Sequence, residues 1–515
     1  MNGPRNLVLA VMLVILAAGF SAASDVYIAQ NAVGGNTGSD CADAHAASWF
    51  NSSTNWGSKA GQIGAGTTVH LCGTLTSNLT ANGSGSSGSP ITILFESGAA
   101  ISLSSCGSTG CLNIAGKSYI VVDGGANGII EATASGSGLP QQGDSIGIYG
   151  RSGMSNCEIK NLSINNMYVH SSLSDNNGNN FYGIWFDGSS NLIHNNVIHD
   201  TMGGVKAETP SSSNQVYNNT IYNINWGIFF SGSGSTPNSM TLNLLYGNEI
   251  YDFANWDTTS DAYHHDGIFL TGGNNVGQAT HNDIYNNYVH GTGGSSPNCT
   301  SSAGSCMTAY MYINSESYTR MFNNLFVAPV GDEGPNDGWV TVYLSDHDSF
   351  YNNTVIGGTT TANNSGNNCV YFASTTNSTV ENNAISNCDT LFWNLTSTFL
   401  TLDYNTYQRP SALTDAWRSG ASLYNTLAAW QAVISAEANS QATTGSLGLS
   451  GAYVPQSGSV VIGAATNLTS LGIAALDSDK AGVARPGGSP AWDAGAYQDP
   501  PGGPQPPTGL TAKVN

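Results

Sequence analysis

Short apolar segments alternate with polar turns through the middle of the chain, in two repeating units. The first unit reads glycine, apolar, any residue, apolar, as in Gly183-Ile184-Trp185-Phe186. The second is an asparagine pair followed by β-forming residues, as in Asn195-Asn196-Val197-Ile198. Successive side chains of a strand point to opposite faces. The pattern therefore predicts short β-strands with one buried face, joined by asparagine-rich turns.

The two units alternate strictly from residue 183 to residue 383. The step from the first unit to the second varies from 12 residues (183 to 195) to 20 residues (227 to 247). Such recurrence is typical of a stacked β-solenoid, in which each coil buries its apolar face against its neighbours. A β-propeller would need a nearly constant period of about 40 residues, whereas the step between first units ranges from 21 (183 to 204) to 42 (267 to the weaker copy that begins at Ala309). We therefore expect an all-β protein, a right-handed parallel β-helix with three strands per coil, whose coils are clearest over 183–390.

The asparagine pairs are expected to be structural. Asparagine tolerates left-handed backbone angles in turns, and its amide can bond the equivalent residue of the next coil. Earlier strands are expected at 68–71, 91–94 and 119–122, and an apolar helical pattern over 423–438 predicts a C-terminal cap helix. Because the ends of a solenoid expose backbone and apolar surface, we expect a cap at each end of a 25–498 domain.

The first 24 residues have the features of a secretory signal peptide. Arg5 precedes an apolar run from Leu7 to Phe20, and Ala22-Ala23-Ser24 supplies small residues for cleavage. A secreted protein, extracellular, periplasmic or at the cell surface, can keep disulfides. Proximity along the sequence pairs eight of the nine cysteines, leaving Cys157 free: Cys41–Cys72, Cys106–Cys111, Cys299–Cys306 and Cys369–Cys388.

Charge is scarce and mostly negative. The 515 residues include 12 Lys+Arg and 33 Asp+Glu, for a formal net charge of −21. This balance argues against nucleic-acid binding, which needs clustered cations. No later segment holds about 18 consecutive apolar residues, so we expect no membrane span. We expect a monomer.

The glycine and asparagine units resemble those of the pectate-lyase-like superfamily of right-handed β-helix proteins. The end of the domain, from Arg485-Pro486 to Trp492-Asp493-Ala494-Gly495-Ala496-Tyr497, resembles the closing motif of secreted bacterial β-helix proteins. Residues 499–515 read as a Pro/Gly linker and the start of a fibronectin type III-like module. The superfamily resemblance implies a secreted polysaccharide lyase, glycoside hydrolase, epimerase, esterase, adhesin or tailspike.

Insertions before three successive glycine strands mark one corner as the functional one, because loops carry function on a rigid scaffold. The first insertion ends with Asp257, Asp261, His264, His265 and Asp266. Asp337 occupies the position of Asp266 two coils later, which implies a separation of about 9.6 Å at ~4.8 Å per coil. Carboxyls that far apart suit an inverting glycosidase. His265 would relay a proton, His264 would bind substrate, and Asp257 and Asp261 could hold calcium.

A second set of candidates lies on the strands themselves. If Ile184 and Phe186 point inward, the alternation of side chains along a strand points Trp185 and Asp187 outward. By the same alternation Lys206 and Glu208 point outward on the next coil. Asp187 and Glu208 would then be a catalytic pair about 5 Å apart, as in retaining enzymes, or members of a surface ion pair. Lys206 is either a lyase base or the ion-pair partner of Glu208. Trp185, Phe229 and Phe269 would form an exposed aromatic row for stacking on sugars.

The motifs of polygalacturonase-like hydrolases are missing, apart from an echo in His265-Asp266-Gly267-Ile268. Pectate-lyase-like enzymes need a basic groove residue and usually calcium, yet the central coils are nearly devoid of cations. We therefore expect a glycoside hydrolase that acts on a polysaccharide and requires no cofactor. The alternatives are a calcium-assisted lyase or epimerase with Lys206 or His265 as base, and a non-catalytic glycan-binding solenoid.

Overall fold

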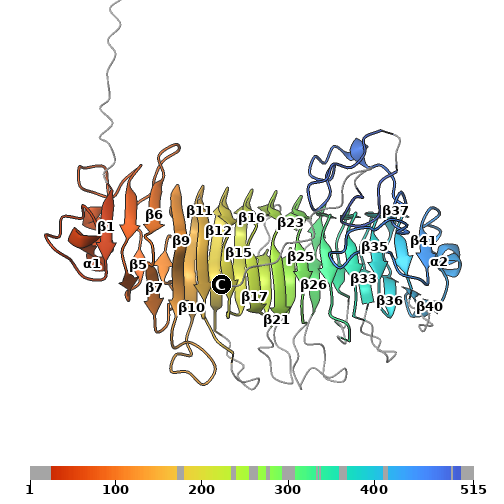
Figure 1. The fold of residues 1–515 in the computed structure, drawn as a ribbon, viewed down its shortest axis with the longest axis horizontal. Helices are drawn as coiled ribbons and strands as arrows, with labels where there is room; N and C mark the ends of the chain where they lie inside the picture. The colour runs from red at the N-terminus through yellow and green to blue at the C-terminus, as the bar shows by residue number, and fades with distance from the viewer. Residues whose placement is uncertain are drawn as a thin grey trace, which may run out of the picture.

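The computed structural model describes residues 25–170, 179–232, 239–253, 265–273, 279–292, 308–331, 335, 338–358, 368–409, 416–488 and 491–499. Stacked parallel strands run along its whole length (Figure 1). The predicted all-β fold is confirmed: the chain is a right-handed parallel β-helix, the hand that parallel crossovers almost always take.

One sheet is built on the glycine units, and we call it the glycine-strand sheet. Its strands pair in parallel along the axis, except that the last two, β39 and β40, are antiparallel. Its members are β5 (Leu79–Thr80), β8 (Leu112–Asn113), β10 (Ser145–Ser155), β12 (Phe181–Ser189), β15 (Gly203–Ser212), β18 (Trp226–Ser231), β22 (Asp266–Thr271), β26 (Ala309–Asn314), β30 (Val340–Tyr343), β33 (Asn368–Ala373), β36 (Thr390–Leu395), β39 (Trp417–Ser419) and β40 (Ser422–Tyr424), with β19 (Met240–Thr241), β23 (Ala279–Thr280) and β27 (Glu316–Ser317) beside them.

The other sheet flanks the asparagine pairs, with one ladder before and one after each pair; we call it the asparagine-turn sheet. The three strands per coil expected from the sequence are seen, for example, in β15, β16 and β17. Its members are β1 (Val26–Ala29), β2 (His45–Ala46), β3 (Thr68–Leu71), β4 (Thr74–Leu75), β6 (Ile91–Phe95), β7 (Ala100–Leu103), β9 (Ile120–Ala132), β11 (Glu158–Asn165), β13 (Leu192–His194), β14 (Val197–His199), β16 (Gln215–Tyr217), β17 (Thr220–Ile224), β20 (Leu244–Tyr246), β21 (Glu249–Phe253), β24 (Asp283–Tyr285), β25 (Tyr288–His290), β28 (Arg320–Phe322), β29 (Leu325–Val327), β31 (Ser349–Tyr351), β32 (Thr354–Ile356), β34 (Ser378–Glu381), β35 (Ala384–Ser386), β37 (Phe399–Asp403), β38 (Thr406–Gln408) and β41 (Gln441–Thr443).

The repeated glycine marks a coil corner where there is no room for a side chain. A Cβ on Gly183 would lie 2.5 Å from Cγ2 of Ile198, the isoleucine of the following asparagine unit. Ile184 is fully buried in the main core. Because Gly183 and Ile184 both face inward, the strand bends there, and the two repeating units pack against each other inside the coil, as they also do at Gly204, Gly227 and Gly267.

The asparagine pairs have the structural roles predicted for them. The first member adopts left-handed angles, as at Asn195 (φ 57°) and Asn218 (φ 53°). The second member is buried, and its Nδ2 donates to Oδ1 of the equivalent asparagine one coil on. This ladder runs through Asn196, Asn219, Asn248, Asn287, Asn324, Asn353, Asn383 and Asn405, at 2.9–3.2 Å per step.

A second, shorter ladder of buried asparagines lies one turn earlier in each coil. Asn191, Asn214, Asn243 and Asn282 are linked in the same way. Each ladder ends on a buried glutamate: Asn282 Nδ2 donates to Glu316 Oε2 (3.1 Å), and Asn405 Nδ2 donates to Glu437 Oε2 (3.2 Å). The stacked amides therefore finish on an acceptor in both ladders.

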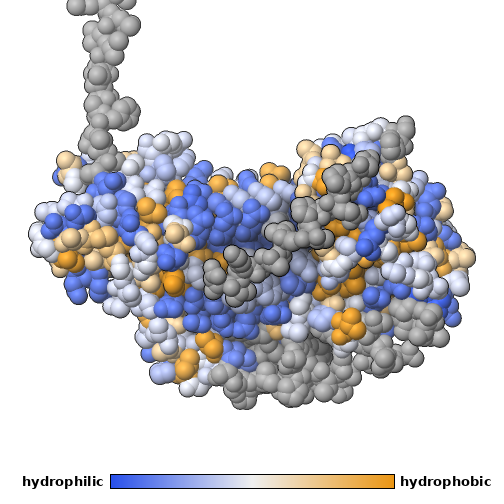
Figure 2. Space-filling view, in the orientation of Figure 1, coloured by the Kyte–Doolittle hydropathy of each residue, from blue (hydrophilic) through white to orange (hydrophobic). Residues whose placement is uncertain are grey.

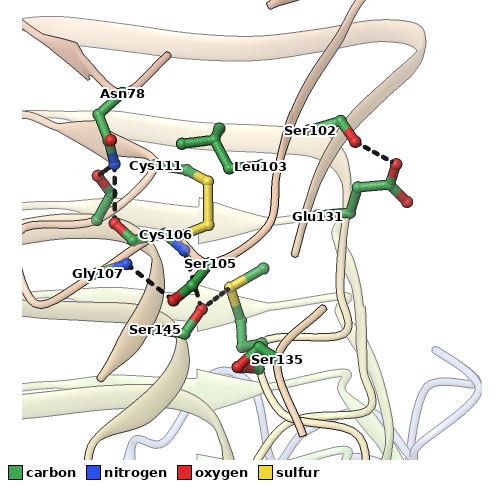
Figure 3. Close-up of a disulfide and its surroundings, with 12 residues drawn as sticks. Asn78, Ser102, Leu103, Ser105, Cys106, Gly107, Cys111, Glu131, Ser135 and Ser145 are labelled. Atoms are coloured by element: carbon green, nitrogen blue, oxygen red, sulfur yellow. Dashed lines mark hydrogen bonds between the residues drawn. A yellow bond between two sulfur atoms is a disulfide. The ribbon is translucent and has the colours of Figure 1, made fainter. Parts of the chain in front are cut away.

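Three of the predicted disulfides are present: Cys41–Cys72, Cys106–Cys111 and Cys369–Cys388. Figure 3 shows the second, where Asn78 Nδ2 donates to the carbonyl of Cys106 (2.8 Å). Cys157 is free and buried, as expected, and Cys299–Cys306 lies outside the described residues.

The helices are short: α1 (Ala47–Phe50) and α2 (Leu427–Ile434), with 3-10 turns at η1 (Cys41–Asp43), η2 (Ser53–Asn55) and η3 (Thr469–Leu471). Figure 1 places α1 and α2 at opposite ends of the coils; that they act as caps stays a prediction. Among the residues with a described structure, no helix has the length and apolar character needed to cross a bilayer.

After the last coil the chain turns back, and residues 447–488 and 491–499 pack on the outside of the asparagine-turn sheet (Figure 1). Arg485 is buried there and donates from Nη2 to Asn323 Oδ1 (2.9 Å). The closing motif thus clamps earlier coils.

Candidate active site

One row of outward-facing positions runs along the glycine-strand sheet. Its members occupy the same register on consecutive strands from β8 to β39, and we call it the outer row. In order they are Asn113, Tyr149, Trp185, Lys206, Phe229, Phe269, Tyr312, Thr341, Tyr371, Trp393 and Arg418.

Lys206 lies in this row between two aromatic residues. Its Nζ lies 4.8 Å from the ring centroid of Trp185 and 5.6 Å from that of Phe229. Nζ also contacts Tyr182, at 3.1 Å from the hydroxyl and 4.6 Å from the ring centroid. The Lys206 side chain keeps only 12% of its surface exposed. A single amine is thus held in a fixed place by three rings.

Four charges converge around this amine. Lys206 Nζ lies 3.0 Å from Glu208 Oε1, and Arg151 contacts both Glu208 (Nη1 to Oε2, 2.5 Å) and Asp187 (Nε to Oδ2, 3.1 Å). Asp187 also accepts hydrogen bonds from the backbone amides of Ser152 (3.0 Å) and Gly153. We call Arg151, Asp187, Lys206 and Glu208 the charge quartet.

Burial is the main influence on the pKa of Lys206. Burial lowers the pKa of the Lys206 amine, and the neighbouring Glu208 carboxylate opposes part of that effect. A lysine with a lowered pKa has a larger neutral fraction near neutral pH and can take up a proton.

The strand-based candidates are brought together as the alternation predicted. Asp187 and Glu208 are register partners on β12 and β15. Both engage the guanidinium of Arg151, so the ion-pair interpretation describes their contacts. The predicted ion pair of Lys206 with Glu208 is confirmed.

The expected row of exposed aromatic faces is wrong at Phe269. That ring is 7% exposed because it stacks on Phe229 (centroids 4.8 Å apart) and meets Tyr312. Trp185 is half-buried, and Arg151 lies 4.7 Å from its centroid. The rings therefore pack against cations and one another.

The insertion-based candidates lie mostly outside the described residues, namely Asp257, Asp261, His264 and Asp337. His265 and Asp266 are described at the start of β22 and are 1% and 0% exposed. The separation of Asp266 from Asp337 stays a prediction. No group of three or more His, Cys, Asp or Glu side chains suited to a metal occurs in the part of the chain with described coordinates.

Sequence reasoning missed Arg151 and Tyr182. Arg151 lies where the pairing of β10 with β12 shifts register, between Gly150 and Met154. Tyr182 precedes the Gly183 bend and joins an outer aromatic cluster instead of the core. Irregular strand positions of this kind often re-aim side chains near functional sites.

No protein-family model matches the chain, and no curated protein matches it. Solved structures resemble it in shape. A GH136 lacto-N-biosidase from Eubacterium ramulus is 12% identical over 78% of this chain and 67% of its own (TM-score 0.42). The pectate lyase Pel9A is 15% identical over 93% and 97% (TM-score 0.44). An alginate lyase from Paenibacillus sp. str. FPU-7 is 16% identical over 78% and 100% (TM-score 0.33). Since these TM-scores lie below 0.5, the argument for function rests on the site itself.

Proposed function

We propose that the chain is a secreted carbohydrate-active enzyme that cleaves an acidic polysaccharide by β-elimination, with Lys206 as the base. The observation that carries this proposal is the position of the Lys206 amine among Tyr182, Trp185 and Phe229, with its pKa lowered by burial. The three disulfides are consistent with secretion.

β-Elimination from a uronic acid requires a base close to a positive charge. In a uronic acid, the carbon next to the carboxylate carries a weakly acidic hydrogen. Lys206 takes this proton, and the electron pair of the broken C–H bond forms a carbon–carbon double bond to the neighbouring carbon. The bond from that carbon to the glycosidic oxygen breaks. The oxygen leaves with the other sugar, takes a proton from solvent and becomes the new chain end. The positive charge of Arg151, joined by that of Lys206 as it takes up the proton, stabilises the negative charge that builds up on the uronate.

Asp187 and Glu208 have a different task in this proposal. They fix Arg151 through two contacts, one from each carboxylate, and Glu208 also holds Lys206. Tyr182, which is 2% exposed, positions Lys206 from beneath. The solvent-facing members of the site are therefore Arg151, Lys206 and Glu208.

Hydrolysis is the second candidate, because Asp187 and Glu208 are register partners one strand apart, as the ~5 Å geometry of a retaining pair requires. Both carboxyls are already engaged by the Arg151 guanidinium, however, whereas an acid catalyst or nucleophile must reach the glycosidic bond. The contacts thus favour elimination over hydrolysis, contrary to our expectation from sequence.

The test is a digest of polygalacturonate, alginate and neutral glucans, followed by ultraviolet absorbance of the unsaturated product and by reducing ends. We expect both signals on a polyuronate, and a loss of roughly 10²–10⁴ in kcat for Lys206→Met. Lys160→Met is the matched control, since Lys160 pairs with Glu158 on the other sheet.

Reducing ends without ultraviolet absorbance would overturn elimination in favour of hydrolysis. Full activity of Lys206→Met would overturn the assignment of the base. A chelator arm tests the calcium-assisted alternative, which predicts that activity disappears with the metal.

A further inference from the structure

The far end of the outer row carries a second arginine–aromatic arrangement. Arg418 and Trp393 are register partners on β39 and β36. The guanidinium carbon of Arg418 lies 3.9 Å from the ring centroid of Trp393, whose other neighbour in the row is Tyr371, 4.2 Å away between centroids. The arginine therefore lies against the end of a stacked pair of rings.

The orientation of Arg418 is fixed by the backbone. Its Nε donates to the carbonyl of Gly420 (3.2 Å), and Trp393 Nε1 donates to the same carbonyl (3.1 Å). Among the described residues Arg418 contacts no carboxylate. In contrast, Arg151 and Arg320 both pair with aspartates. In a protein with 33 acidic residues and only 12 Lys+Arg, a half-buried arginine with no acidic partner in the described part of the chain suits a carboxylate supplied from outside.

The distance between Lys206 and Arg418 sets the minimum length of a ligand that contacts both residues. Seven strand steps separate Lys206 from Arg418 along the outer row, about 34 Å at ~4.8 Å per step. Phe269, Tyr312, Thr341 and Tyr371 between them are each at most 7% exposed. Contacts with a ligand on this row are thus concentrated at its two ends.

We infer that Arg418, stacked on Trp393, forms a remote subsite that binds the carboxylate of a uronic-acid residue in the same polymer that reaches Lys206. This inference rests on the proposed function for its substrate class. It makes the enzyme one that prefers long polyuronates, because a short oligosaccharide cannot reach both ends of the row.

The experiment measures binding and turnover separately. Calorimetry with Lys206→Met protein gives affinities for polygalacturonate, for trigalacturonate and for the carboxyl-reduced polymer, each with and without Arg418→Gln. We expect Arg418→Gln to weaken binding of the polymer roughly tenfold or more, and to leave the trisaccharide and the carboxyl-reduced polymer unchanged. Lys59→Gln, the same charge change at an exposed lysine in the N-terminal region, should change none of them.

In the active enzyme the same substitution should raise KM for the polymer and leave kcat within about twofold. If the Arg418→Gln variant binds the polymer as tightly as the parent does, or loses as much affinity for the trisaccharide as for the polymer, the subsite is overturned. This holds even if the protein is a lyase. Selective loss of polymer binding in a protein that cleaves no polyuronate would support the subsite and refute the proposed reaction. Trp393→Leu, which removes the platform and keeps the arginine, should reproduce part of the loss.

Discussion

The amine of Lys206 and the hydroxyl of Tyr182 lie 3.1 Å apart beneath the surface of the glycine-strand sheet. A hydrogen bond to the ammonium form favours that form and holds the side chain in one rotamer. The tyrosine is thus a positioning residue, because it is buried and acts on substrate only through Lys206.

Tyr182→Phe should lower kcat roughly tenfold, the worth of a hydrogen bond to a charged group, and leave KM nearly unchanged. Since the phenyl ring cannot accept from the ammonium, the acid limb of the pH–rate profile should move to lower pH. A full pH–rate profile for both proteins measures this. An unchanged limb with a reduced kcat would assign Tyr182 to packing alone.

Arg151→Met should destabilise the protein, since it leaves Asp187 nearly buried with its negative charge unpaired. Removing one partner of a fully buried pair costs about 3–5 kcal/mol; because Arg151 is 25% exposed, we expect about 2–3 kcal/mol after screening. Urea unfolding measures the loss. Adding Asp187→Asn should restore part of it, and strict additivity of the two substitutions would contradict the coupling.

Gly227→Ala tests the coil corner. The added Cβ would lie 2.4 Å from the carbonyl oxygen of Gly267 and 2.6 Å from Cγ2 of Ile250. Overpacking of this kind costs about 1–3 kcal/mol, to be read from the midpoint of urea unfolding. Gly143→Ala is the matched control, because no heavy atom lies within 4 Å of the Cβ it would gain, and its stability should stay within about 1 kcal/mol of the parent.

The carboxyls of Glu316 and Asp348 predict a stability that falls as pH rises. Both are fully buried and bind Thr319, Glu316 through the hydroxyl (3.2 Å) and Asp348 through the backbone amide (2.9 Å). Burial, and secondarily the charge of Asp348, raises the pKa of Glu316 well above its ordinary 4.5. Burial raises the pKa of Asp348 from 3.8 to about 7.

A raised folded-state pKa gives stability that is complete below the unfolded value and lost as pH rises through the folded one. The free energy of unfolding should therefore decline from about pH 4 to beyond pH 7. Asn282, Ser345 and Asp346 also face this pair, and Glu437 titrates in the same direction, with its pKa raised to about 6 by burial. The diagnostic quantity is consequently a difference: Glu316→Gln should gain stability relative to the parent at pH 8 and not at pH 4. Parallel curves would refute the assignment.

The fold was predictable because each repeated residue has one geometric task. Glycine is needed at Gly183 for lack of space, and asparagine at Asn195 for its left-handed backbone. These constraints act locally and recur in successive coils, so they are visible in the sequence as a repeat. The three described disulfides followed from proximity along the sequence.

The site was predictable only where the strands are regular. Alternation placed Lys206 and Glu208 on one face correctly, but it fails at Arg151, where β10 shifts register, and at Tyr182, where the chain bends before Gly183. The burial of Phe269 depends on its ring neighbours in adjacent coils, and no single strand carries that information.

The asparagine ladders also give the solenoid a direction of growth. Every rung accepts at Oδ1 from one side and donates from Nδ2 to the other, so a coil duplicated between Asn219 and Asn353 would find matching partners on both of its sides. A coil added beyond Glu437 would not, because this carboxylate accepts from the amide before it and has no N–H to donate to a further rung. Such a chain could lengthen by internal duplication while its two ends stay fixed.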